Sequence, residues 1–358
     1  MTFEEARAAF PVLERYAYLN AGSAGPLARQ TYEAMVEAGK EELGPRGGLE
    51  AFGGIMELRE RLRGVIAGEI GVDADRVSLT TSTSEGCRVV LAGLDLAPED
   101  EIVTTDAEHF GLLGPVHASG ARVRVARVRE RPPAEALDAI VAEVGPQTKL
   151  IGLSHVLWLD GHVLPLDELQ EAVSVPLLVD GAQSVGAIPV AAKPFDFYTV
   201  SGQKWLCGPT PTGGLYVRDP EALRVGAPSY FSQASHEPDG SFEPRDGARR
   251  FDQSWVPAAF IAGLEAAIAG MPDWRFERSR EISDLCRERL LAAGCDVVTE
   301  AGHSNLVSWR WEGDTREAVK RLYAEGVVVR DLPGTGLIRA SCGYWTSEED
   351  IDRLVSAL

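Results

Sequence analysis

Apolar and polar residues alternate in two repeating patterns between residues 56 and 218. Short runs rich in β-branched residues have the length of buried strands, and longer segments repeat apolar residues at helical spacing. The predicted strands are residues 76–81, 101–105, 122–128, 149–156, 176–180, 195–200 and 214–218, and the predicted helices are residues 56–71, 85–95, 133–145 and 166–173. This alternation predicts an α/β domain with a mostly parallel sheet flanked by helices.

The last third of the chain mixes strand and helix patterns differently. Its predicted helices are residues 256–293, 315–326 and 348–358, and its predicted strands are residues 305–311, 327–330 and 336–341. We therefore predict a large α/β domain over residues 16–255 and a small C-terminal α+β domain over residues 256–358, joined by an N-terminal helix at residues 1–15. Residues 224–254 show no periodicity, and a loop of this length predicts a site cover or a subunit contact.

Composition and charge exclude several classes of function. The chain of 358 residues has 35 Lys and Arg against 54 Asp and Glu, which gives a net charge of −19. Binding to nucleic acid or to an anionic membrane needs clustered basic residues, so neither is expected. The N-terminus shows no signal-peptide pattern, no apolar run reaches membrane-spanning length, and the five cysteines show no C-x-x-C spacing. We expect a cytoplasmic protein with reduced thiols and no metal site.

The turn after the first predicted strand places small hydroxyl residues at the start of a helix. It reads TSTSEG over residues 81–86 and includes Thr83 and Ser84. Free N–H groups, the helix dipole and two hydroxyls make such a turn suitable for binding phosphate. A plain Ser/Thr N-cap with a capping glutamate explains the same residues. Taken alone, the turn fits the N-cap better.

Four more residues that can bind a ligand lie at or shortly after predicted strand ends: His109, Trp158, Asp180 and Lys204. Each has a plainer explanation, because a lone histidine or tryptophan usually lies in a core or on a surface and Asp-Gly is a strong turn dipeptide. The carboxyl ends of parallel strands share one edge of a sheet, however, where ligands bind. A phosphate cradle, an aromatic ring, a carboxylate and a lysine amine are together what pyridoxal 5'-phosphate (PLP) requires.

Eight motifs in this chain resemble those of the class V aminotransferase family of fold-type I PLP enzymes, and they occur in family order. They are YLNAGSAGPL (18–27), TSTSEG (81–86), DAEH (106–109), SHVLWLDGHVLPL (154–166), VDGAQSVGAIPV (179–190), SGQKWLCGPTPTGGLYV (201–217), RRFDQSW (249–255) and LIRASCGYWTSEEDIDRL (337–354). The family includes cysteine desulfurases, kynureninase and isopenicillin N epimerase. The resemblance covers nearly the whole chain and implies the fold of that family.

The resemblance implies a role for each site residue. Lys204 is the amine that forms the Schiff base and moves the Cα proton, Asp180 pairs with the pyridine nitrogen, and His109 stacks on the ring. The other cofactor-binding residues implied are Thr83, Ser84, Ser201 and Gln203 at the phosphate and Gln183 near the ring hydroxyl. The implied substrate-binding residues are Arg339, which clamps the α-carboxylate, and Trp158, Asn20 and Ala21. A surface ion pair is the plainer explanation of Arg339, but a solitary arginine in an apolar strand argues against it.

The resemblance also implies a homodimer with active sites at the interface. In that arrangement Ser254 or Gln253, from the RRFDQSW segment, reaches the phosphate of the partner subunit. Two positions depart from the family pattern. Gln203 stands where histidine usually precedes the lysine, and Trp158 stands where desulfurases often have asparagine.

The interval between Arg330 and Arg339 bears on the reaction. A cysteine desulfurase needs a nucleophilic cysteine on a mobile loop there, and this interval is short and has none. Cys207 and Cys342 are expected to be buried and inert rather than persulfide carriers. The remaining pattern is similar to that of cystine and cysteine C–S lyases in the family, which implies β-elimination from a small amino-acid substrate. Transamination, epimerisation and desulfuration are the alternatives, and a non-catalytic relative is disfavoured by the intact lysine and carboxylate.

Overall fold

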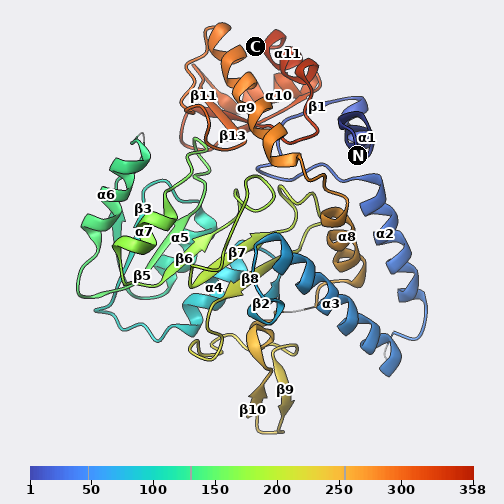
Figure 1. Cartoon of the computed structure of the whole chain (residues 1–358), viewed down its shortest axis with the longest axis vertical. Coiled ribbons are helices and arrows are strands. Elements are labelled where there is room, and N and C mark those ends of the chain that lie inside the picture. Colours follow the sequence, from blue (N-terminus) through green and yellow to red (C-terminus); the bar gives the residue numbers. More distant parts are fainter. Residues whose placement is uncertain (47, 130, 254) are drawn as a thin grey trace.

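A computed structural model describes residues 1–46, 48–129, 131–253 and 255–358 (Figure 1). Its main element is a seven-stranded sheet in the order β2-β8-β7-β6-β5-β3-β4. The strands are β2 (Val77–Thr80), β3 (Glu101–Thr105), β4 (Arg122–Ala126), β5 (Thr148–Ser154), β6 (Leu177–Asp180), β7 (Phe197–Ser201) and β8 (Gly213–Val217). Strand β8 runs in the opposite direction to the other six strands of this sheet. The predicted mostly parallel sheet is therefore confirmed.

Helices cover both faces of this sheet, which explains why its central strands are largely apolar and buried. They are α3 (Leu49–Glu69), α4 (Thr83–Gly93), α5 (Phe110–Ala118), α6 (Pro133–Glu143) and α7 (Leu166–Ala172). In β6, Leu177 and Val179 join the core that contains α3, α6 and α7, whereas Leu178 joins the core that contains α4 and α5. Successive strand residues point to opposite faces, so both faces need apolar side chains. No helix within the described ranges is long and apolar enough to cross a membrane.

The last part of the chain forms a second, smaller body, at the top of Figure 1. Its antiparallel sheet has the order β11-β14-β13. Its elements are α9 (Arg275–Ala292), β11 (Leu306–Arg310), α10 (Thr315–Ala324), β12 (Val327–Val328), β13 (Arg330–Leu332), β14 (Leu337–Ser341) and α11 (Glu348–Ser356). The start of the chain packs here too, because β1 (Ala17–Tyr18) pairs with β12 and Arg7 of α1 (Phe3–Ala8) binds Asp350 of α11 through two hydrogen bonds.

The prediction of one long helix over residues 256–293 is wrong. The segment forms α8 (Ala258–Ala269) and α9, and the chain turns between them at Gly270 and Pro272. Proline cannot continue a helix, and glycine readily ends one. Helix α8 packs against α2 (Arg29–Lys40) and α3, and its Leu264 belongs to the core of the large sheet. We therefore propose that the boundary between the two domains lies at this turn rather than at residue 256.

Residues 224–254 contain more regular structure than the pattern predicted. Strands β9 (Gln233–His236) and β10 (Phe242–Pro244) form an antiparallel hairpin that projects from the lower end of the molecule (Figure 1). Its strands are polar and largely exposed, so they carry no apolar alternation for a pattern to detect.

Candidate active site

The carboxyl ends of β6 and β7 bring the predicted carboxylate and lysine to one edge of the sheet. Asp180 is the last residue of β6 and is buried. Its Oδ1 accepts hydrogen bonds from the backbone N–H of Ala182, at 2.9 Å, and from Thr199 Oγ1, at 3.3 Å. Thr199 lies in β7, so the strand that leads to Lys204 also orients the carboxylate.

Lys204 lies in the turn after β7, under the loop that follows β1. The Gln203 carbonyl accepts a hydrogen bond of 2.8 Å from Gly25 N. A Cβ on Gly25 would lie 2.1 Å from the Lys204 carbonyl oxygen, so only glycine allows this close approach. Burial lowers the pKa of Lys204, the charge of Asp180 opposes this shift, and the charges of Arg339 and Arg330 add to it; the resulting pKa is about 8. The amine is therefore suited to Schiff-base chemistry near neutral pH.

His109 begins α5 and lies beside the ring of Trp158. Its Nδ1 accepts a hydrogen bond of 3.0 Å from Gly111 N, which leaves the proton of the neutral ring on Nε2. The two rings meet edge to face, with centroids 5.2 Å apart. Burial, and then the charge of Lys204, lower the pKa of His109. A neutral, flat imidazole fits the stacking role that we predicted and still propose.

The start of α4 is compatible with both explanations of the TSTSEG turn, the helix N-cap and the phosphate-binding site. Ser82 is the N-cap and accepts from Glu85 N at 3.2 Å, while the Glu85 carboxylate accepts from Thr81 N at 2.7 Å. These residues do the capping. The hydroxyls of Thr83 and Ser84 have no hydrogen-bond partner among the described residues. A helix N-terminus with two unengaged hydroxyls fits a phosphate group.

Arg339 is buried in β14, so a surface ion pair does not explain it. Its Nη1 donates to the Trp158 carbonyl at 2.6 Å. Asn20 bridges Ser341 in the same region, and a Cβ on Gly22 would lie 2.6 Å from Arg339 Nη2. Four buried atoms here lack a hydrogen-bond partner within the described part of the chain: Arg339 Nε, Trp158 Nε1, Asn20 Oδ1 and Ser341 Oγ. Each such group costs about 1–3 kcal/mol unless a ligand pairs with it.

Arg330 is a second cation at this site that the sequence reasoning missed. It lies opposite Arg339 in the pairing of β13 with β14, and its Nη1 donates to Ser23 Oγ at 3.1 Å. Its charge contributes to the lowered pKa values of Lys204, His109 and Arg339. Burial is the larger cause for Arg339, whose pKa falls to about 9. Two adjacent guanidinium groups make the site attractive to anions.

Glu108 is a buried carboxyl that was also missed, although it precedes His109 directly. It accepts hydrogen bonds from Ser154 N at 3.0 Å, Ser154 Oγ at 2.5 Å and Thr105 Oγ1 at 2.7 Å. Burial raises the pKa of Glu108, the hydrogen bonds from Ser154 and Thr105 oppose the shift, and the charge of Asp180 adds to it; the resulting pKa is about 7. Glu108 thus ties the end of β3 to the end of β5, beneath the segments that carry His109 and Trp158.

The substitution Glu108→Gln should flatten the pH dependence of stability. In the wild type, unfolded Glu108 loses its proton near pH 4.5, whereas folded Glu108 keeps it to about pH 7. The folded state therefore binds the extra proton in this window, and stability falls as the pH rises through it, by on the order of 3 kcal/mol. Glutamine can keep the three hydrogen bonds without titrating. Urea unfolding at pH 5 and pH 8 measures how the free energy of unfolding changes with pH. The same change in the wild type and in Glu108→Gln would contradict the prediction.

Five other predicted site residues are Gln183, Ser201, Gln203, Ala21 and Ser254. Gln183 bridges two segments, because its Nε2 donates to the Gly22 carbonyl at 2.8 Å and its Oε1 accepts from Trp205 Nε1 at 2.9 Å. Its contact with the ring hydroxyl stays a prediction. Ser201 Oγ donates to Gln203 Oε1 at 3.1 Å, which joins the two predicted phosphate ligands. Ala21 is fully buried. Ser254 lies outside the described residues, so its role, like the homodimer, stays a prediction.

The fold and these groups define the chain as a fold-type I PLP enzyme. A buried carboxylate, a lysine of lowered pKa and a helix N-terminus with unengaged hydroxyls lie at one sheet edge, and these are the groups that PLP requires. A family model described as aminotransferase class-V matches residues 18–354. The chain belongs to this family, and PLP is its cofactor.

Three known proteins illustrate the relationship. Isopenicillin N epimerase from Streptomyces clavuligerus is 32% identical over 99% of this chain and 97% of its own length. A probable cysteine desulfurase from Methanothermobacter thermautotrophicus is 30% identical over 100% of this chain and 98% of its own. The third is C-DES, described as a cystine C–S lyase. A C-DES variant with glycine covalently linked to PLP has a TM-score of 0.90 and 29% identity, and the match covers 98% of both chains. The complex of C-DES with its product cysteine persulfide has a TM-score of 0.89.

Proposed function

We propose that this enzyme is a C–S lyase that cleaves cystine, cysteine or a related S-substituted cysteine by β-elimination. The observation that carries the proposal is the hairpin between Arg330 and Arg339. Leu332 pairs with Leu337 across a four-residue turn, so the hairpin is tight as well as free of cysteine. A desulfurase thiolate has no place on it. The likeness to C-DES over nearly the whole of both chains supports the same choice.

Cys207 and Cys342 do not supply the missing thiolate. Burial raises the pKa of the Cys207 thiol far above its usual range, and its Sγ lies 3.7 Å from the Trp205 carbonyl. Cys342 is fully buried in the core of the small body. The raised pKa of Cys207 makes it a poor nucleophile, and burial keeps Cys342 out of reach of a substrate, so neither residue suits a persulfide carrier.

In the proposed reaction, three residues act on the substrate and the cofactor: Arg339, Lys204 and Asp180. Arg339 binds the α-carboxylate, and the Lys204 amine removes the Cα proton. The Asp180 carboxylate holds a proton on the pyridine nitrogen. When bound, PLP supplies an electron-accepting ring that stabilises negative charge at Cα. Departure of the β-sulfur group and consumption of one water give pyruvate, ammonia and a thiol or, from cystine, cysteine persulfide.

Trp158 and Arg330 would shape the substrate end of the site. The indole N–H of Trp158 is buried without a partner among the described residues and can donate to the substrate. Arg330 offers a second positive charge beside Arg339. A substrate with a carboxylate in its leaving group, such as cystine, could pair with both arginines, which favours cystine over a neutral S-alkyl cysteine.

The direct test is to incubate the PLP-loaded protein with L-cystine and to measure pyruvate with lactate dehydrogenase. We expect pyruvate and persulfide in equal amounts. S-methylcysteine and cysteine, assayed beside cystine, define the preferred leaving group. If no S-substituted cysteine yields pyruvate, the lyase proposal is wrong.

The identity of 32% to isopenicillin N epimerase supports epimerisation as a second candidate. Both reactions begin with loss of the Cα proton, but an epimerase returns a proton to the opposite face and keeps the β-substituent. An assay in D₂O separates the two. Deuterium at Cα of recovered substrate, with change of configuration and no pyruvate, identifies an epimerase.

The substitution Arg339→Gln should raise KM for the amino-acid substrate and lower kcat/KM by about a hundredfold or more, because a buried charge-assisted contact with the carboxylate is lost. Arg310→Gln is the matched control, since Arg310 lies on the neighbouring strand β11 and is exposed to solvent. Steady-state kinetics of both variants with one substrate measure the effect. Equal losses in the two variants would point to a general loss of folding instead.

A further inference from the structure

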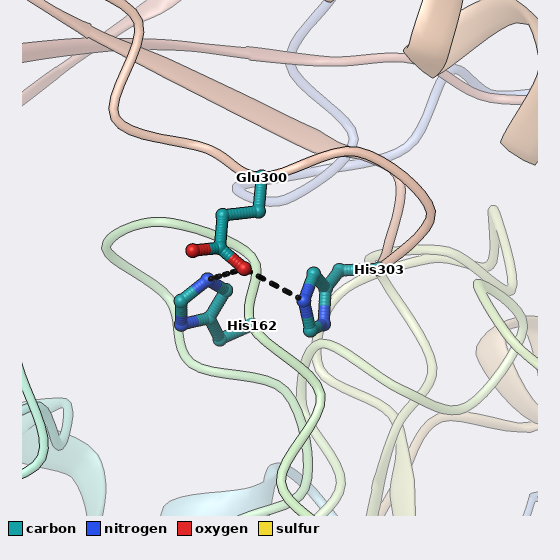
Figure 2. Close-up of side chains that lie close together, drawn as sticks. All are labelled: His162, Glu300 and His303. Carbon is teal, nitrogen blue, oxygen red and sulfur yellow. Dashed lines mark ion pairs between the residues drawn. The ribbon is translucent and has the colours of Figure 1, made fainter. Parts of the chain in front are cut away.

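Three side chains outside the active site converge where the loop between β5 and α7 meets the turn before β11 (Figure 2). They are His162, Glu300 and His303, which we call the His162–Glu300–His303 cluster. Glu300 Oε2 lies 3.6 Å from His162 Nε2 and 3.5 Å from His303 Nε2. One nitrogen or oxygen atom from each residue lies within 4.8 Å of the others. Two imidazoles and a carboxylate are a common ligand set for metal ions.

The state of His162 points independently to a ligand. His162 is 5% exposed, and its Nε2 is buried with no hydrogen-bond partner among the described residues. Its other ring nitrogen, Nδ1, lies 3.8 Å from Asp160 Oδ2. A histidine that binds a metal through one nitrogen typically presents the other to a carboxylate, which sets its tautomer. Asp160 is too far from Nδ1 for a hydrogen bond, but its negative charge favours a proton on that nitrogen, which leaves a free lone pair on Nε2, on the side of Glu300.

An ordinary ion-pair cluster accounts less well for this arrangement. The contacts of 3.5 and 3.6 Å are longer than charge-assisted hydrogen bonds.

We propose that His162, Glu300 and His303 bind one first-row divalent cation per chain, with Zn²⁺ the best match. A tetrahedral zinc ion with bonds of about 2.0–2.1 Å places its ligand atoms about 3.4 Å apart. The two measured separations from Glu300 are close to this value. Glu300 and Asp160 together offset the charge of the ion. The Glu300 side chain is 56% exposed, so an ion can reach the site and water can complete its coordination.

Binding requires one local change. His303 Nδ1 accepts a hydrogen bond of 3.3 Å from Val163 N. A metal on Nε2 moves the ring proton to Nδ1, so this long hydrogen bond is lost. One weak bond is a small loss against two nitrogen–metal bonds.

The ion would join the two bodies of the enzyme near the active site. Thr299 Oγ1 already donates to the Asp160 carbonyl at 2.8 Å, and Ser308 Oγ to the Leu159 carbonyl at 2.6 Å. The same loop carries Trp158, whose carbonyl holds Arg339. A cation at the cluster would cross-link this loop to the small body, which makes it a structural site that supports the substrate-binding arginine.

The test is a zinc titration of the chelator-treated holoenzyme, in competition with a chromophoric chelator. We expect one Zn²⁺ per chain and a rise in the thermal midpoint when zinc is added. Glu300→Gln should weaken binding by at least tenfold, and Asp160→Asn, which removes only the outer carboxylate, by about tenfold. Glu300 is exposed, so its variant should fold normally. Glu300→His restores a third ligand and should recover tight binding.

Two controls complete the experiment. His236→Gln removes an exposed histidine of the β9–β10 hairpin and should leave zinc affinity unchanged. Cys295→Ser tests the most accessible thiol and should also have no effect. The proposal is overturned if the wild type binds no zinc, if Glu300→Gln binds it as tightly as the wild type, or if Cys295→Ser abolishes binding.

Discussion

Replacing Lys204 with alanine is expected to reduce turnover by about a thousandfold or more, because no other described group of the site can take its place as the base at Cα. Asp180 is held as an acceptor by Ala182 and Thr199, and His109 uses Nδ1 as the cap of α5. The variant should also lose the visible absorbance that arises from the covalent link between lysine and PLP. Its fold should survive, since alanine removes a partly exposed side chain whose loss leaves no buried partner unpaired.

The matched variant is Cys207→Ser, three residues along the same turn. It removes the thiol at nearly constant volume, and we expect turnover at the wild-type level because the buried thiol has no role in the proposed reaction. Pyruvate formation and absorbance spectra of the two variants separate the possibilities. If Cys207→Ser loses activity while Lys204→Ala keeps it, a thiol-based mechanism replaces the one proposed here.

The position of the central site could be predicted from the sequence because parallel strands end at one edge of a sheet. Asp180 and Lys204 each follow an apolar run, and the structure places the ends of these runs on the adjacent strands β6 and β7. The pattern also showed that Arg339, a charged residue in an apolar strand, is unlike a surface arginine. In these cases local pattern and tertiary position coincide.

Other features depend on contacts between distant segments, and no local pattern reveals them. Arg330 ends an ordinary run of valines, and only the pairing of β13 with β14 brings it opposite Arg339. Glu108 owes its raised pKa to burial between the ends of β3 and β5, which only the folded chain brings together. His162 and His303 meet across the two bodies, so the expectation of no metal site, drawn from cysteine spacing, did not consider them. The sequence does contain a signal for the break between α8 and α9, namely Gly270 and Pro272. The prediction of one helix gave more weight to the apolar periodicity on either side of them.

A further long-range feature, which explains part of the RRFDQSW segment, is a buried ion cluster around Asp252. Its carboxylate accepts hydrogen bonds from Arg59 at 2.9 Å, Arg63 at 2.8 and 3.1 Å, and Leu79 N at 2.9 Å. Arg59 also lies over the ring of Phe231, 4.2 Å from its centroid. Burial alone raises the pKa of Asp252, but the two guanidinium groups outweigh it and hold the pKa below its usual value. The cluster ties α3 and β2 to the segment that leads toward Ser254.

The substitution Asp252→Asn should therefore lower the free energy of unfolding by about 3–5 kcal/mol, because it leaves two buried arginines without their shared counter-charge. The wild-type advantage should be present at pH 7 and shrink in acid, since a carboxyl of depressed pKa loses its stabilising effect as the pH falls through its folded-state pKa. Asp246→Asn, an exposed aspartate of the same segment, is the matched control and should change stability little. Urea unfolding of the three proteins at pH 7 and at pH 3 tests this. A loss for Asp252→Asn no larger than that for Asp246→Asn would show that the arginines find other partners, with Glu60, 3.3 Å from Arg63, the nearest available.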